Sequence, residues 1–211
     1  FASPMPAGSL VMDWFRADGN RFSSSRFIIL DQNETVFLWE DFTKKPAPLH
    51  RQALFREIRR PVTSITLQGV DYFVIAEKSG KITLLRSNGA IKSGFPIDLG
   101  NRIEGGFATT INPLNGQPEL VGVTSLGELT YVELNGKLRQ TKQLYRPESS
   151  AVFRTLFDSN GLDWLLLRFS ETKMAVLNKN GDELFEVKGL NAASDVQYHF
   201  FGSENRFISI R

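Results

Sequence analysis

The chain has 211 residues and contains no cysteine and only two histidines, His50 and His199. The absence of cysteine excludes disulfide scaffolds, thiolate-ligated zinc or iron–sulfur sites, and thiol nucleophiles. Two histidines leave little for a His-ligated metal centre or for acid–base catalysis. We expect His199, which lies in a β-rich run, to be packed or pore-lining rather than catalytic.

Long apolar runs and an imbalance of charge are missing as well. The stretch Trp164–Leu167 is typical of the apolar runs, whereas a membrane-spanning helix needs about 20 such residues. We therefore predict no transmembrane segment in this chain. The 25 Lys plus Arg and 23 Asp plus Glu leave a formal charge of +2, so no general attraction to nucleic acid is expected.

The motifs of common enzymes are absent too. There is no phosphate-binding glycine loop, no Gly-x-Gly-x-x-Gly, no His-Glu-x-x-His and no Gly-x-Ser-x-Gly. Acid pairs such as Glu40-Asp41 and Asp182-Glu183 are adjacent, and adjacent residues of a strand point to opposite faces. They cannot form the facing carboxyl pair of a glycosidase by themselves. We predict that the chain is not an enzyme.

What the sequence does contain is an internal repeat. Three Asn-Gly pairs, at Asn88, Asn135 and Asn180, recur at spacings of 47 and 45 residues. The same two spacings connect a second set of glycines, and apolar positions between the markers agree as well. These matching positions are Gly69, Gly116 and Gly161, then Val74, Val121 and Leu166. A period near 46 residues is typical of propellers and solenoids.

Each copy contains four short β-rich runs separated by turn residues, which in the second copy are Pro61–Leu67, Tyr72–Ala76, Ile82–Arg86 and Ile91–Leu99. Asn-Gly suits tight hairpins because glycine adopts positive φ at low steric cost. Several runs are almost wholly apolar, which indicates strands covered on both faces. The pattern predicts an all-β fold, a β-propeller or partial propeller built from four-stranded antiparallel blades. A β-sandwich is the alternative, but it would not hold one register across the copies.

We expect one repeat domain over residues 1–211. The predicted blade-like copies are residues 9–58, 60–100, 106–145 and 151–190, with a partial fifth copy at 194–211. About four and a half copies is not a whole number. Either the last two strands complete a blade begun at the N-terminus or the chain is part of a longer propeller with an exposed sheet edge, and we favour the second.

A basic stretch interrupts the pattern between residues 44 and 60, where six Lys or Arg accompany one Glu. It reads as one or two helical turns or as a loop that runs into a strand. As a binding patch it would suit an anionic partner, and the alternative is a solvated connection between strands. The residues of this predicted patch are Lys44, Lys45, Arg51, Arg56, Arg59 and Arg60.

The segment Gly80–Gly100 runs from glycine to a strand, to Asn-Gly and to Gly-Phe-Pro, and in this order it resembles FG-GAP or VCBS-type propeller repeats. Segments Asn115–Gly136 and Asp158–Leu167 are similar to them in the same way. That resemblance implies a bacterial surface or secreted protein, located outside the cytoplasm in the periplasm, at the cell surface or in the medium.

The resemblance also implies a candidate metal site. In that family the turn between the first two strands of a blade often carries a calcium loop, and calcium requires several hard oxygen ligands. Asp158, Asn160 and Asp163 form the best match, and a weaker one consists of Asn112, Asn115 and Glu119. An ordinary Asn-Gly turn is the alternative at residues 158–163. No other cofactor is predicted.

We therefore expect a non-catalytic binding or scaffolding module with a protein partner. The alternative is a carbohydrate-binding, lectin-like domain or one associated with a polysaccharide lyase, in which aromatic side chains would stack on sugars. For Trp39 and Trp164, whose neighbours are apolar, packing between blades is the preferred interpretation.

Overall fold

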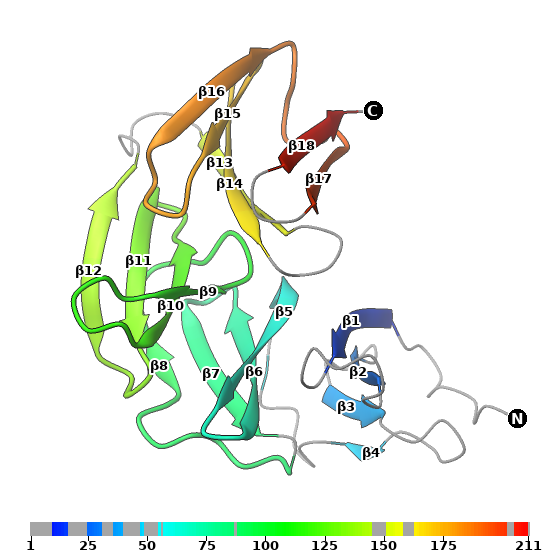
Figure 1. Cartoon of the computed structure of the whole chain (residues 1–211), viewed down its shortest axis with the longest axis vertical. Coiled ribbons are helices and arrows are strands. Elements are labelled where there is room, and N and C mark those ends of the chain that lie inside the picture. The colour runs from blue at the N-terminus through cyan, green and yellow to red at the C-terminus, as the bar shows by residue number, and fades with distance from the viewer. Residues whose placement is uncertain are drawn as a thin grey trace, which may run out of the picture. The chain divides into compact units, whose positions relative to one another are not determined.

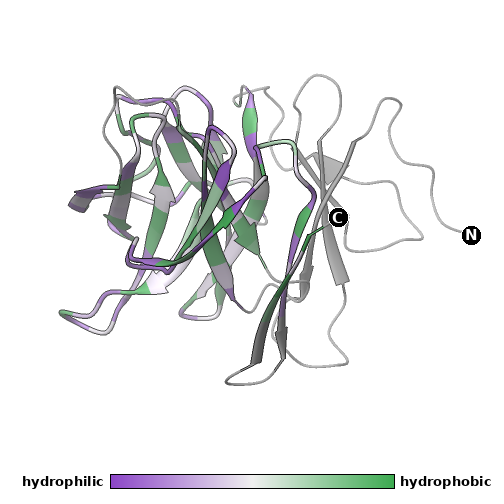
Figure 2. Cartoon of the chain, turned by 90° about the horizontal axis from the view of Figure 1, so that it is seen from above, coloured by the Kyte–Doolittle hydropathy of each residue, from purple (hydrophilic) through white to green (hydrophobic). Residues whose placement is uncertain are grey.

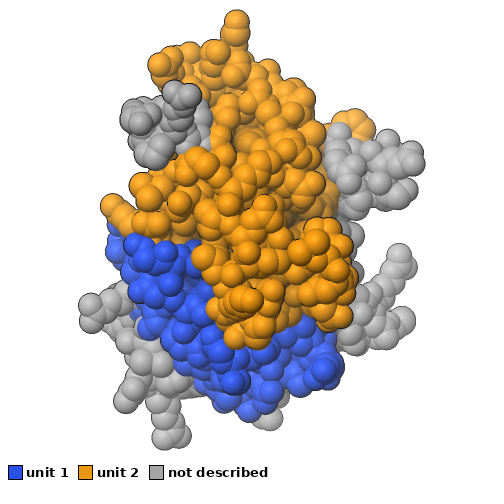
Figure 3. All heavy atoms as spheres, turned by 90° about the vertical axis from the view of Figure 1, so that its left-hand side faces the viewer, with its two compact units in different colours: residues 1–100 blue, residues 101–211 orange. Residues whose placement is uncertain are grey.

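The computed structural model describes residues 10–16, 25–30, 36–39, 47–48, 55, 57–86, 88–144, 151–157, 163–201 and 205–210. The chain forms two compact units, residues 1–100 and 101–211, which are coloured separately in Figure 3 and treated separately below. All the regular structure described is β-strand. Within those residues there is accordingly no helix long and apolar enough to cross a membrane.

Unit 1 contains two four-stranded antiparallel sheets with strands in sequence order (Figure 1). The first sheet consists of β1 (Leu10–Arg16), β2 (Ser25–Leu30), β3 (Val36–Trp39) and β4 (Ala47–Pro48). The second consists of β5 (Ile58–Leu67), β6 (Val70–Glu77), β7 (Lys81–Arg86) and β8 (Ile97–Asp98). Each strand pairs with the next one along the chain, which is the up-and-down order predicted for a blade.

Unit 2 contains two more such sheets and a two-stranded one (Figure 1). The first consists of β9 (Ala108–Ile111), β10 (Pro118–Val123), β11 (Glu128–Glu133) and β12 (Leu138–Gln143). The second consists of β13 (Ala151–Phe157), β14 (Trp164–Ser170), β15 (Lys173–Leu177) and β16 (Glu183–Lys188). The hairpin that follows consists of β17 (Val196–Phe201) and β18 (Asn205–Ile210), the two strands predicted for the partial fifth copy.

The repeated Asn-Gly pairs form the same turn after the third strand of three sheets, those that begin with β5, β9 and β13. Gly89, Gly136 and Gly181 have φ of 84°, 90° and 76°. Each donates its backbone N–H to a carbonyl three residues earlier, at 2.9 Å. The left-handed conformation that this turn requires is accessible to glycine without a steric penalty. The sequence repeat is therefore a repeat of hairpins between third and fourth strands.

The middle strands are covered on both faces, as their apolar runs predict. All residues from Tyr72 to Glu77 in β6 and from Trp164 to Leu167 in β14 are buried. In unit 2 one apolar core lies on the face of β14 that contains Leu166, and another on the face that contains Leu167. In Figure 2, hydrophobic and hydrophilic segments alternate along the strands.

The fourth strand predicted in the second copy, Ile91–Leu99, is mostly not a strand. Only Ile97 and Asp98 form β8, while Ile91 makes an isolated bridge with Leu85. Between them Gly94 adopts a φ of 88°, and Pro96 has no N–H to donate to a ladder. The turn and the proline divide the predicted strand in two.

The fourth strands of the two four-stranded sheets in unit 2, β12 and β16, each contain a β-bulge at the same place in the repeat. Tyr131 pairs with Gln140 and Val132 with Leu138, so Arg139 is an extra residue in β12. In β16 the pairs of Val176 with Phe185 and Leu177 with Glu183 leave Leu184 as the extra residue. A bulge changes the direction of the side chains around it.

Candidate functional site

The predicted calcium loop at residues 158–163 is described only at Asp163, because Asp158 and Asn160 lie outside the described residues. Asp163 is buried at the start of β14. One carboxylate oxygen lies 2.5 Å from the Lys179 Nζ, and the other accepts a hydrogen bond of 2.7 Å from the Tyr198 hydroxyl. Both oxygens of Asp163 thus contact protein donors from other strands or turns.

The residues of the weaker calcium candidate, Asn112, Asn115 and Glu119, make hydrogen bonds within unit 2. The Asn112 and Asn115 side-chain oxygens accept the backbone N–H groups of Leu114 and Gln117, both at 2.9 Å. Glu119 is buried in β10 and is bound through both its oxygens by Arg139. Both Glu119 oxygens are thus engaged by Arg139, and calcium binding at these residues stays a prediction.

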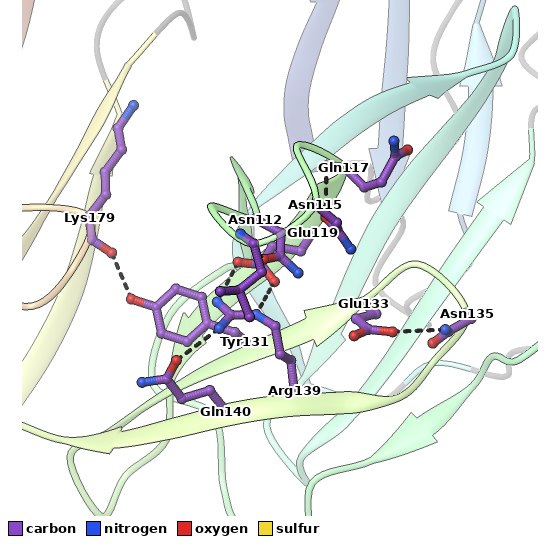
Figure 4. A network of polar contacts seen from close by, with 11 residues as sticks. Asn112, Asn115, Gln117, Glu119, Tyr131, Glu133, Asn135, Arg139, Gln140 and Lys179 are labelled. Atoms are coloured by element: carbon purple, nitrogen blue, oxygen red, sulfur yellow. Dashed lines mark hydrogen bonds and ion pairs between the residues drawn. The ribbon is translucent and has the colours of Figure 1, made fainter.

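Arg139 and Tyr131 build the polar network drawn in Figure 4. The Arg139 guanidinium lies 4.7 Å from the centre of the Tyr131 ring and donates two hydrogen bonds to Glu119, at 2.6 and 2.7 Å. A third hydrogen bond, of 2.8 Å, reaches the side-chain oxygen of Gln140. This arrangement is bidentate and largely buried, which is the strong form of an Arg–carboxylate pair.

The electrostatics of this network follow from burial and pairing. The hydrogen bond to Glu119 raises the pKa of Arg139 above its ordinary value, although desolvation opposes it. Burial raises the pKa of the Tyr131 hydroxyl above its usual 10.0, and the nearby Arg139 charge offsets this only in part. Arg139 therefore stays charged and Tyr131 stays neutral at physiological pH.

The same network connects the two four-stranded sheets of unit 2. The Tyr131 hydroxyl donates a 3.0 Å hydrogen bond to the carbonyl of Lys179, in the turn between β15 and β16 (Figure 4). Lys142 in β12 donates to the carbonyl of Asn180 in that turn, at 2.8 Å. The Trp164 indole donates to the carbonyl of Thr109 in β9, at 3.1 Å. These hydrogen bonds hold the two sheets together, and all their donors and acceptors belong to the chain itself.

Sequence reasoning missed the Glu119–Arg139 pair, although one signal was present. Glu119 directly precedes the apolar run Leu120–Val123, where an acidic residue on a buried strand requires a partner. Arg139 could not be identified as that partner, because its direction depends on the bulge in β12.

Of the predicted basic patch, the side chain of Arg59 alone is described. Arg59 lies in β5 opposite Ala76 and is partly buried, and Arg60 is the next residue of that strand. The prediction of a loop running into a strand agrees with the start of β5 at Ile58. Lys44, Lys45, Arg51 and Arg56 lie outside the described residues, so the patch stays a prediction.

Among the aromatic and histidine residues singled out in the sequence, the side chains of Trp164 and His199 are described, and the role predicted for His199 stays a prediction. Trp164 is buried and packs into an apolar core, as predicted for a residue between blades. His199 lies on β17 and contacts the Ser209 hydroxyl at 3.3 Å. Trp14 and Trp39 lie on β1 and β3, but their side chains are outside the description.

Large apolar side chains are exposed at several places on unit 2. Across the described ranges no group of three or more acidic or histidine side chains is arranged to hold a metal ion. The exposed apolar residues lie instead on turns and outer strands. They include Ile111 at the end of β9, Leu114 between β9 and β10, Leu126 between β10 and β11, Leu138 in β12, and Leu184 and Phe185 in β16. Singly exposed apolar residues are common on protein surfaces, whereas neighbouring ones that form a contiguous patch mark binding sites.

The chain matches no protein-family model and no curated protein. It is similar to BBS1N in two crystal structures of its complex with ARL6DN, soaked with mercury and with lead. The TM-scores are 0.55 and 0.53, the identity is 15% in both, and the matches cover 98% and 99% of this chain and 75% of BBS1N. BamB from Moraxella catarrhalis matches with a TM-score of 0.49 and 16% identity, over 97% of this chain and 64% of BamB.

BBS1N is a β-propeller protein. At 15% identity the likeness to BBS1N concerns the fold alone. It agrees with the consecutive four-stranded antiparallel sheets of both units. The chain therefore has an all-β fold of the β-propeller class, built from four-stranded antiparallel blades.

Proposed function

We propose that this chain is a non-catalytic β-propeller module that binds a protein partner outside the bacterial cytoplasm. One observation carries the proposal. The two buried acids Glu119 and Asp163 are each bound by protein cations, while large apolar side chains are exposed on turns and outer strands of unit 2. The charged chemistry is thus used to hold the blades, and the apolar surface is available to a partner.

The comparison with BBS1N supports the same type of function. BBS1N was crystallised as a complex with another protein, ARL6DN, and its fold is similar to that of this chain. A fold does not determine a ligand, so the identity of the partner does not follow from this similarity. The FG-GAP or VCBS character and the extracytoplasmic location rest on the Gly80–Gly100 pattern and stay part of the proposal.

The proposal is tested by reconstitution from purified components. Cross-linking and mass spectrometry in extracts of the source organism supply candidate proteins, and each is then purified and titrated against the full chain by calorimetry. We expect at least one to bind saturably with a micromolar Kd or tighter. If none of the purified candidates binds, the protein-binding function is wrong.

A broad glycan array applied to the same preparation tests the carbohydrate alternative. Trp164 is buried, with its indole N–H bonded to Thr109, and is not positioned to stack on a sugar. We expect no glycan to bind. Saturable glycan binding without a protein partner would replace the proposal with a lectin-like function. Fractionation of the source cells tests the location, and recovery of the chain in the cytoplasm would contradict it.

A further inference from the structure

The connection between β9 and β10 carries an exposed apolar tip. Leu114 is 81% exposed and Ile111 is 61% exposed, and Pro113 between them is exposed as well. No other large hydrophobic side chain in the described parts of the chain is as exposed as Leu114. Such a residue contributes little to folding, since burial of apolar area is what stabilises a protein.

Hydrogen bonds within the connection 112–117 stabilise the conformation of the tip. The Asn112 backbone N–H donates to the Gln117 carbonyl and the Gly116 N–H to the Asn112 carbonyl, both at 2.8 Å. The Asn112 side chain is 2% exposed, and its oxygen accepts the Leu114 N–H at 2.9 Å. A partner that binds this tip would lose little conformational entropy in ordering it, which favours affinity.

One equivalent connection in unit 1, between β5 and β6, shows that the hairpin can form without a loop of this length. There β5 and β6 are joined by only two residues, Gln68 and Gly69, and neither of them has a large apolar side chain. The connection between Ile111 and Pro118 has six residues, 112–117. A connection of six residues, 158–163, also joins β13 to β14, so it is the exposed apolar tip rather than the length that this comparison leaves to be explained.

The chemistry of the loop selects the type of partner. Residues 108–118 include no charged and no aromatic side chain. Sugar binding normally uses aromatic stacking, and membrane-surface binding normally uses basic or aromatic residues beside the apolar ones. An aliphatic tip with exposed amides at Asn115 and Gln117 suits an uncharged apolar pocket with a polar rim on a protein.

We propose that Ile111, Pro113 and Leu114 form the apolar anchor by which unit 2 binds its partner protein, with Leu114 inserted into an uncharged pocket of that partner. This inference rests on the proposed protein-binding function and assigns it to one loop. It also predicts that salt has little effect on the affinity, because no charge takes part in the contact.

The absence of cysteine allows a site-specific test. Leu114→Cys and Leu126→Cys each introduce a single thiol, to which a photo-crosslinker is attached. Leu126 is a matched control: it is 41% exposed and lies at the opposite end of β10. We expect the probe at position 114 to label the partner, and the probe at position 126 to label it much less.

Affinities for the purified partner then decide the inference. We expect Leu114→Ser to weaken binding about thirtyfold, the effect of a hot-spot residue, and Leu126→Ser to change it less than about twofold. Circular dichroism should give the same Tm for both variants and the unsubstituted chain. If the partner binds all three equally, the anchor is wrong and the proposed function stands; if no purified protein binds the full chain, both fail.

Other occupants would give different results. Cross-linking from position 114 to a second copy of the chain would assign the loop to self-association. Flotation with phosphatidylcholine vesicles that is lost in Leu114→Ser would assign it to a lipid surface. Either outcome overturns the proposal, as does a tenfold loss of affinity between low and high NaCl.

Discussion

Glu119 and Arg139 are bonded through two hydrogen bonds although their strands, β10 and β12, are separated in the sheet by β11. The guanidinium reaches across β11 by lying over the ring of Tyr131. The bulge that makes Arg139 an extra residue in β12 accompanies this direction of the side chain. A buried acid, an aromatic ring and an outer-strand cation thus form one structural unit.

Removal of one member of this pair should be costly. In Glu119→Gln the Arg139 guanidinium loses its buried counter-charge, and we expect the free energy of unfolding to fall by about 3 kcal/mol. Urea denaturation measures the change. The exposed pair of Lys173 and Glu186 is the control, since Glu186→Gln should cost less than about 1 kcal/mol. Equal effects in the two variants would contradict a special role for the buried pair.

Gly122 is required in β10 by a neighbouring ring. A Cβ at this position would lie only 2.7 Å from the Cζ of Phe107, a side chain that is fully buried. We expect Gly122→Ala to destabilise the protein by about 3 kcal/mol through overpacking. Thermal and urea denaturation measure this loss. Phe107→Leu added to Gly122→Ala should restore part of the stability.

Gly116→Ala serves as the control for Gly122→Ala. A Cβ at Gly116 would meet open space, so only its left-handed φ of 69° disfavours alanine. That conformational cost is about 1 kcal/mol. If Gly116→Ala destabilised the protein as much as Gly122→Ala, contact with Phe107 would not be the cause.

Calcium should not stabilise the chain. Both carboxylate oxygens of Asp163 already contact Lys179 and Tyr198. We therefore expect the same Tm in calcium and in a chelator, measured by differential scanning fluorimetry. A Tm that rises with calcium, and no longer does so in Asp163→Asn, would restore the metal site predicted for Asp158, Asn160 and Asp163.

Tyr131 should make the stability decrease at alkaline pH. Because burial raises the pKa of its hydroxyl above 10.0, the neutral form is favoured in the folded state. This contribution is fully present below the pKa of the unfolded chain and is lost as the pH rises through the higher pKa of the folded one. Urea denaturation between about pH 9 and 11 should show a steeper loss in the unsubstituted protein than in Tyr131→Phe. Parallel curves would show that this group does not titrate differently on folding.

Much of the architecture could be predicted because hairpins are local. The Asn-Gly pairs at Asn88, Asn135 and Asn180 mark turns whose conformation depends on two residues, and the structure has these turns. The apolar run Trp164–Leu167 correctly indicated a strand buried on both faces. The free energy gained by moving these side chains out of water depends on their own composition, which is local information as well. The prediction of one strand over Ile91–Leu99 was wrong, because Gly94 and Pro96 interrupt the ladder of backbone hydrogen bonds.

The candidate sites were less predictable because they depend on residues distant in the sequence. Asp163 reads as a calcium ligand beside Asp158 and Asn160, but its contacts are Lys179 and, 35 residues away, Tyr198. The exposure of the apolar tip at Leu114 was not predicted either. Asn112-Pro113 and Asn115-Gly116 indicate a turn around it, but a turn does not by itself show how far a leucine is exposed.

By itself, then, the sequence determined the repeat, the strand order within each copy and the all-β class, because turn chemistry and hydrophobic periodicity act over a few residues. The tertiary structure decided which polar groups pair and which apolar groups remain exposed. Glu119 meets Arg139 only after three strands align and one bulges. Pairing and exposure depend on the packing of whole sheets, which no short stretch of sequence encodes.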